Sequence, residues 1–212
     1  MTQTQTLTAE DLFRSAYENR YTWDAQFPGY SCDVTMTTPE GSYSAHATID
    51  SELKFEVTGV EDDSAKKAIT QQLWEITIHR VNHSFAKSHG DNTFSFGDSK
   101  DGEVEIVVGG ASAGNRYKVK DKHVTFVYRR MGAGIVSIDT YGFLDTEKGY
   151  LSTGYDSIYL DAETLQPKGG KTVFEDTFTE IGGYYILTNR KITKNENGTT
   201  STTEFDFSNV TL

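Results

Sequence analysis

The stretch YYILTNRKITKNENGTTSTTEFDFSNVTL, residues 184–212, decides the fold class of this chain. Asn197-Gly198 separates two runs in which apolar and polar residues alternate. Such a pair between alternating runs is the strongest short-range signal for a β-hairpin, because both residues tolerate the positive φ angles of a tight turn. We therefore expect two antiparallel strands here.

The same alternation of strand-like runs and turn signals extends upstream to residue 92. Asp101-Gly102, Asp121-Lys122, Gly169-Gly170 and Gly182-Gly183 mark further turns. Short connections make sequential strands antiparallel neighbours, so we expect one long meander over 92–212. Its expected strands are 92–97, 103–108, 115–120, 123–130, 134–144, 150–160, 171–180, 184–194 and 199–211.

The first part of the chain combines helices with a shorter set of strands. Thr8 is a suitable N-cap for a helix over 8–20. Strand-like runs follow within 31–58, namely at 31–37, 42–50 and 53–58. A long helix is expected over 63–88, beginning at an Asp63 or Ser64 cap and stopping near Gly90.

This long helix carries two apolar stripes. One consists of Ala65, Ile69, Leu73 and Ile76, and the other, roughly opposite, of Trp74, Ile78, Val81 and Phe85. A helix on a protein surface has one apolar stripe, so this helix is expected either to kink near residue 76 or to be covered on both sides. The expected fold is a single domain, 1–212, of mainly antiparallel β structure: a strongly curved sheet or incomplete β-barrel, with the long helix as a lid on its concave side.

Composition removes several classes of function. The net charge of −11 disfavours binding to nucleic acid, which needs clustered Lys and Arg. Cys32 is the one cysteine, so an internal disulfide is excluded. The first ten residues show neither a basic start nor an apolar core of a signal peptide, and no apolar run approaches the roughly 20 residues of a membrane helix. We therefore expect a cytoplasmic protein that is not membrane-integral.

Two motifs point weakly to enzymatic chemistry. Gly110–Gly114 matches G-x-S-x-G, but a strand-like run follows it where a hydrolase needs a helix, so we reject a hydrolase. Glu75, His79 and His83 repeat every four residues on the long helix and are weak candidates for metal ligands, although further ligands are missing. No cofactor is expected, and we expect a protein that is not an enzyme.

Aromatic side chains indicate a different use of the fold. Val124, Phe126 and Tyr128 alternate on one strand, and Tyr155 and Tyr159 on another. If the sheet faces the long helix, a cavity for an apolar ligand can form between them; an ordinary filled core is the alternative. The expected lining residues are Trp74, Ile78, Phe85, Phe126, Tyr128, Tyr155 and Tyr159.

The order of elements is similar to that of LolA/LolB-type lipoprotein carriers, incomplete barrels whose helical lid covers a cavity for acyl chains. The final stretch from Ile181 resembles the closing strands of that fold. In detail the chain resembles an uncharacterised family of cyanobacteria and plastids, known only as a domain of unknown function. That resemblance rests on YENRYTW (17–23), FPGY (27–30), QLWE (72–75), IHR (78–80), GYLS (149–152) and YDS (155–157).

These observations predict a non-enzymatic binder or carrier of an apolar small molecule, such as a lipid, a fatty acid or a pigment. Lipoprotein carriers of the LolA type work outside the inner membrane and carry export signals, whereas this chain shows none. The alternative is an assembly or scaffolding factor that acts through protein–protein contacts.

Overall fold

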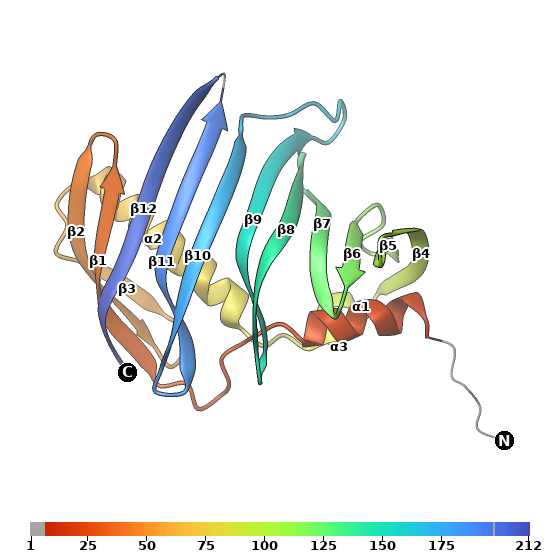
Figure 1. Ribbon diagram of the computed structural model, residues 1–212, viewed down its shortest axis with the longest axis horizontal. Coiled ribbons are helices and arrows are strands. Elements are labelled where there is room, and N and C mark those ends of the chain that lie inside the picture. Colours follow the sequence, from red (N-terminus) through yellow and green to blue (C-terminus); the bar gives the residue numbers. More distant parts are fainter. Residues whose placement is uncertain (1–6, 197) are drawn as a thin grey trace. The chain divides into compact units, whose positions relative to one another are not determined.

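Twelve strands and three helices form the part of the chain that the structure, a computed structural model, describes: residues 7–196 and 198–212 (Figure 1). The contacts divide the chain into two compact units. The first comprises the residues up to Tyr21 together with His83–Lys171, and the second Thr22–Asn82 together with Thr172–Leu212. The expectation of a single domain over 1–212 stays a prediction.

The first unit is an antiparallel sheet with two helices on one face. Its sheet has the order β9-β8-β7-β6-β5-β4, so each strand pairs with its neighbour in sequence. Helix α1 lies against β4, β6, β7 and α3. The elements are α1 (Ala9–Glu18), α3 (Phe85–His89), β4 (Asn92–Lys100), β5 (Glu103–Gly110), β6 (Arg116–Lys120), β7 (His123–Met131), β8 (Gly134–Thr146) and β9 (Gly149–Asp161).

The second unit is a sheet of order β3-β2-β1-β12-β11-β10 that carries α2 on one face. Figure 1 shows the strands of this sheet twisting across α2 (yellow). Strand β1 pairs with β12, which joins segments far apart in the sequence; Val34, for example, lies opposite Phe207. The elements are β1 (Gly29–Thr38), β2 (Gly41–Asp50), β3 (Phe55–Thr58), α2 (Asp63–Arg80), β10 (Lys171–Ile181), β11 (Tyr184–Glu196) and β12 (Thr199–Thr211).

The expected fold class, mainly antiparallel β structure with an unclosed sheet, is confirmed. Strands β3 and β4, the first and last in the strand order, each pair on one side only, so the sheet does not close. Every strand expected from turn chemistry is present within a few residues of its expected bounds. In the last hairpin Asn197 lies outside the described residues, and Gly198 adopts the positive φ of 78° that the turn requires.

Helix α1 begins where its capping residue predicts. The Thr8 hydroxyl accepts a hydrogen bond from the Asp11 backbone N–H at 3.1 Å, and the Asp11 carboxylate accepts one from the Thr8 backbone N–H at 3.3 Å. These reciprocal bonds satisfy N–H groups that have no partner within the helix. The hydrogen bonds from Thr8 also lower the pKa of the Asp11 carboxyl.

The single helix expected over 63–88 is wrong, because the chain leaves helical geometry after Arg80. Val81 is extended, with φ −68° and ψ 130°, and Ser84 starts α3 by accepting a hydrogen bond from the Lys87 backbone N–H. β-branched, Asn and Ser residues have low helix propensity, and Ser is a preferred N-cap. A cap signal inside the expected helix therefore ends α2 and begins α3.

Candidate functional site

One stripe of α2 is buried and holds the helix on its sheet. Ala65, Ile69 and Leu73 are at most 1% exposed, and α2 lies against β1, β2 and β3. The sheet contributes buried apolar side chains to the same unit: Val34, Ala47, Ile49, Val57, Ile186, Phe205 and Phe207. Each fully buried aliphatic or aromatic side chain stabilises the fold by about 1.5–3 kcal/mol. Buried side chains from both elements therefore occupy the space between α2 and this sheet.

The other stripe of α2 is exposed. The side chains of Trp74 and Ile78 are 47% and 40% exposed. The residues next to Trp74 in sequence are more covered: Leu73 is fully buried and Glu75 is half-buried. Residues four apart lie side by side on a helix, so Trp74 and Ile78 form one continuous apolar surface. We call these two residues the Trp74–Ile78 surface. The first expected stripe is therefore present and packed on α2, whereas the second is reduced there to Trp74 and Ile78, because Val81 and Phe85 lie beyond the end of the helix.

A buried charged network fixes α2 to β10 and β11. The Arg190 guanidinium, on β11, donates to both carboxylate oxygens of Asp176 on β10, from Nε to Oδ1 at 2.8 Å and from Nη2 to Oδ2 at 2.6 Å. Its Nη1 donates to Gln72 Oε1 at 3.0 Å and to Glu75 Oε2 at 3.1 Å, both on α2. We call these four residues the Arg190 network. Bidentate Arg–carboxylate pairs are directional as well as strong.

The members of the Arg190 network differ in burial. The side chains of Arg190 and Asp176 are 6% and 2% exposed, whereas that of Glu75 is 28% exposed. A buried guanidinium is costly to desolvate, so it is retained only where its donors are satisfied. Sequence reasoning missed this network. The available signal was Arg190 itself, because strand alternation places this charged residue on the same face as the apolar residues Ile186 and Ile192.

Phe85, expected to line a cavity with Trp74, lies in the core of the first unit. It is 3% exposed and packs with Phe13 of α1, with the ring centroids 5.8 Å apart. The core cluster around it consists of Ala9, Phe13, Ala16, Phe85, Ile106, Val108, Tyr117 and Val119. The end of α2 at Arg80 explains the difference, because it separates Phe85 from the stripe of Trp74.

The bulge in the β6–β7 pair changes which β7 side chains share a face. Val124 pairs with Val119 and packs against the core cluster, whereas Phe126 pairs with Lys118. Adjacent residues of β6 point to opposite faces, so Val124 and Phe126 do as well. The alternation expected to place Val124, Phe126 and Tyr128 on one face is therefore wrong for Val124.

The remaining expected lining residues of the first unit also divide between two faces of the sheet. Tyr159 pairs with Val136, which pairs with Arg129. Residues directly opposite each other on neighbouring strands share a face of the sheet, so Tyr159 lies on the same face as Arg129. Arg129 and Tyr128 are adjacent on β7 and point to opposite faces, so Tyr159 and Tyr128 lie on opposite faces. The chain therefore places one aromatic pair on each face: Phe126 and Tyr128 on one, Tyr155 and Tyr159 on the other.

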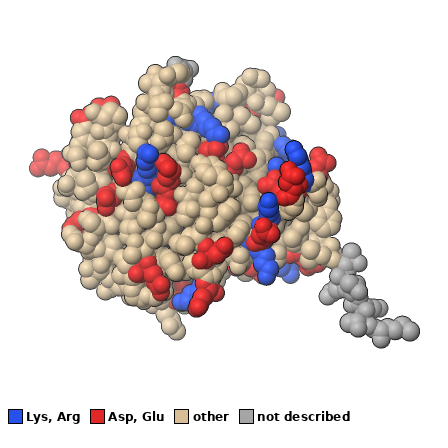
Figure 2. All heavy atoms as spheres, in the orientation of Figure 1, with Lys and Arg blue, Asp and Glu red and all other residues tan. Residues whose placement is uncertain are grey.

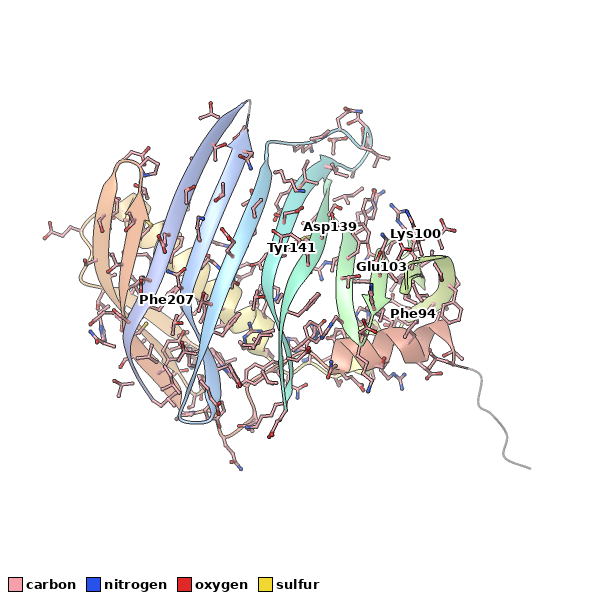
Figure 3. All side chains as sticks on the ribbon, viewed as in Figure 1. Phe94, Lys100, Glu103, Asp139, Tyr141 and Phe207 are labelled. Carbon is pink, nitrogen blue, oxygen red and sulfur yellow. The ribbon has the colours of Figure 1, made fainter. Side chains whose placement is uncertain are left out.

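The sheet face that carries Phe126 also carries charged side chains, which form an ion pair and a cation–π contact. Lys118 lies over the Phe126 ring at 5.3 Å and forms an ion pair with Glu103 at 2.9 Å. Asp139 is opposite Phe126, and Figure 3 shows it on β8 with Tyr141. Burial raises the pKa of the Asp139 carboxyl, and the Asp156 carboxylate raises it further. On the face shown in Figure 2, Lys and Arg lie interspersed with Asp and Glu, which gives mixed rather than single-sign charge there.

The weak metal candidates are not brought together as a ligand set. Glu75 and His79 lie on α2, but His83 follows the end of that helix, so the spacing of four no longer places it on the same face. Glu75 instead accepts hydrogen bonds from Arg190 and from Gln71. Among residues 7–196 and 198–212, no group of three or more His, Cys, Asp or Glu has a metal-binding arrangement. The G-x-S-x-G match at 110–114 is the connection between β5 and β6.

No helix within the described part of the chain is both long and apolar enough to cross a membrane. Among the expected lining residues, Trp74 and Ile78 lie side by side on α2, and Phe126 and Tyr128 lie side by side on β7 with their ring centroids 6.5 Å apart.

Comparisons with known proteins identify a family and add a distant likeness. A search of the curated proteins gives no match. Among solved structures, the chain is similar to a domain of an outer membrane lipoprotein-sorting protein from Vibrio parahaemolyticus, at 10% identity, a TM-score of 0.32 and coverage of 96% of this chain and 92% of that one. This TM-score does not establish a shared fold. The model of a family described as "Protein of unknown function (DUF3386)" matches residues 4–212, so the chain belongs to the DUF3386 family.

Proposed function

We propose that this protein is a non-enzymatic binder of an apolar small molecule, with the Trp74–Ile78 surface as the contact. The observation that carries the proposal is the exposure of a Trp and an Ile, at 47% and 40%, one turn apart on a helix whose other stripe is buried. Single exposed apolar residues are ordinary on protein surfaces, but adjacent large ones mark interaction sites more often.

The energetics favour covering this surface. A Trp side chain removes about 150–250 Å² from water on burial, at about 25 cal/mol per Å². Covering the exposed half of Trp74 thus contributes about 2–3 kcal/mol, and Ile78 adds to it. The ligand is placed on the open stripe of α2 because side chains occupy the interface between α2 and its own sheet. A lipid, a fatty acid or a pigment has the apolar surface that this stripe requires.

The two tryptophans give a direct test. Trp23 is 5% exposed and Trp74 47%, so the Trp23→Phe variant reports on Trp74 alone. We expect its emission to shift to the blue when a medium-chain fatty acid is added, because the indole leaves water. Calorimetry of Ile78→Ser should show weaker binding, and Met131→Ser, which removes a 52% exposed apolar residue from the first unit, should bind like wild type. Unchanged emission over the full titration, for fatty acid and fatty alcohol alike, would refute the proposal.

An assembly factor that acts through protein contacts is the second candidate. The same surface supports it, because Trp is enriched in protein interfaces and the interior of the second unit is filled by its own side chains. Recovery of one defined protein by wild type, lost with Trp74→Ser and retained with Met131→Ser, would favour this candidate. Binding of the fatty acid at Trp74 would favour the small-molecule binder.

A further inference from the structure

We infer that Arg190 is a positioning residue that sets the register of α2 on its sheet and thereby fixes where along the sheet α2 presents Trp74 and Ile78. The inference deepens the proposed function and rests on it for its consequence in ligand binding. It concerns residues of the second unit only, namely the Arg190 network and the two stripes of α2.

The apolar contacts of α2 do not define a register by themselves. The buried stripe repeats small and aliphatic residues at intervals of four: Ala65, Ile69 and Leu73. One helical turn is about 5.4 Å, so a slide by one turn replaces one aliphatic side chain by another on the same face. Hydrophobic burial is non-directional, so after such a slide apolar side chains would still face the sheet.

The Arg190 network is directional and does define the register. Gln72 and Glu75 both accept from Nη1 of Arg190, while Asp176 holds the other edge of the guanidinium. A slide of one turn would move both acceptors away and leave donors of a buried cation unpaired. Removing one partner of a buried ion pair leaves an uncompensated buried charge, so the slid arrangement is strongly disfavoured.

A backbone hydrogen bond near the end of α2 does not replace this function. The Trp23 N–H donates to the Arg80 carbonyl at 2.9 Å. A carbonyl is present at every residue, so this bond holds the helix end but does not recognise a particular side chain. Gln72 and Glu75 flank Trp74 in sequence, and their contact with Arg190 directs Trp74 to the opposite side of the helix.

The test separates register from stability. In the Arg190→Leu/Asp176→Leu variant, apolar side chains replace the buried pair, and such replacements are often neutral or stabilising. Both this variant and its parent carry Trp23→Phe and 5-fluorotryptophan, so that Trp74 gives the ¹⁹F signal. We expect one sharp resonance in the parent, and two or more resonances or marked broadening in the variant at an unchanged or higher melting temperature.

A second variant tests the inference in case the first variant does not fold. Gln72→Leu/Glu75→Ala removes both acceptors on α2 and leaves the Arg190–Asp176 pair intact. We expect the same heterogeneity at Trp74 and fatty-acid binding weaker by about tenfold. Lys67→Ala, an exposed change on the same helix, should keep one resonance and the parent affinity.

The outcomes distinguish the two proposals. A single sharp resonance in both folded variants would overturn the register inference, whatever the protein binds. If the parent binds no fatty acid but the variants show several resonances, the register inference stands and the proposed function fails. Parent-like affinity in variants with several resonances would overturn the link between register and binding.

Discussion

The imidazole of His89 on α3 lies edge-on against the ring of Phe13 on α1, with 5.1 Å between the ring centroids. Four further rings surround it within 6.2 Å: Tyr17, Phe85, Phe94 and Tyr117. Burial, followed by the positive charges of Arg20 and Arg129, lowers the pKa of His89 from 6.5 to about 4. Between pH 6.5 and about 4 this imidazole is therefore neutral in the folded protein and protonated in the unfolded chain.

The first prediction is a loss of stability on acidification. Between pH 6.5 and about 4 the unfolded state binds the His89 proton and the folded state does not, so the free energy of unfolding falls as the pH is lowered through this window. The full shift would correspond to about 3 kcal/mol, and solvent screening of this partly buried group makes the effect smaller. Urea unfolding of His89→Phe should give a flatter dependence on pH than wild type over this range. An identical slope in the two proteins, or an NMR titration of His89 near 6.5, would contradict the prediction.

Truncating the two tryptophans should have very different costs. The Trp23 ring stacks on Phe27 at 4.0 Å, and its indole N–H donates to the Tyr185 carbonyl at 3.3 Å. Trp23→Ala should lower the free energy of unfolding by about 3–5 kcal/mol, because it leaves a cavity. Trp74→Ala should change it by about 0.5 kcal/mol or less, as for an exposed site. Chemical denaturation measures both, and similar losses would show that Trp74 has a structural role.

Gly149 is predicted to be intolerant of a side chain. Its φ is +116°, and an added Cβ would lie 3.0 Å from the Arg20 carbonyl carbon and even closer to the Asn19 carbonyl oxygen. Gly149→Ala should destabilise the protein by more than about 2 kcal/mol, since backbone strain and a clash add together. Gly114→Ala is the matched control: its φ is +91°, but nothing lies within 4 Å of the added Cβ. Equal melting temperatures for the two variants would contradict the clash.

Cys32 should be unreactive in the folded protein. It is 1% exposed, and burial, followed by the Asp33 carboxylate, raises the pKa of its thiol to about 12. The thiolate is the reactive form, so at neutral pH we expect no reaction with an aromatic disulfide reagent. In urea the same reagent should titrate one thiol per chain. Rapid reaction without denaturant would show that β1 opens readily.

Local sequence signals predicted the strands well, because each turn carries its own chemistry. Asp101 and Gly102 have the positive φ angles of 52° and 80° that make such pairs good turn residues. The strand faces were harder to predict, because one bulge shifts the pattern. The bulge between Lys118 and Val119 moves Val124 to the core face, and a pattern of alternation alone does not reveal an inserted residue.

The parts of the candidate site that depend on distant contacts were not predictable in the same way. Trp74 and Ile78 were identified from helical periodicity, which is a local signal. The partners of Arg190 lie on β10 and α2, separated from it by a turn and by much of the chain. A charged residue at an inward strand position indicates that a partner exists, but it does not identify that partner.

The pairing of β1 with β12 has a consequence for biosynthesis. Val34 leaves the ribosome long before its partner Phe207, so the β1–β3 segment waits with one edge unpaired while the intervening chain is made. The strands of the first unit, by contrast, pair only with sequence neighbours over residues 92–161 and can form as they emerge. The second unit therefore completes last, and until then its open edge, with Cys32, Val34 and Met36 uncovered, is where a chaperone is needed most.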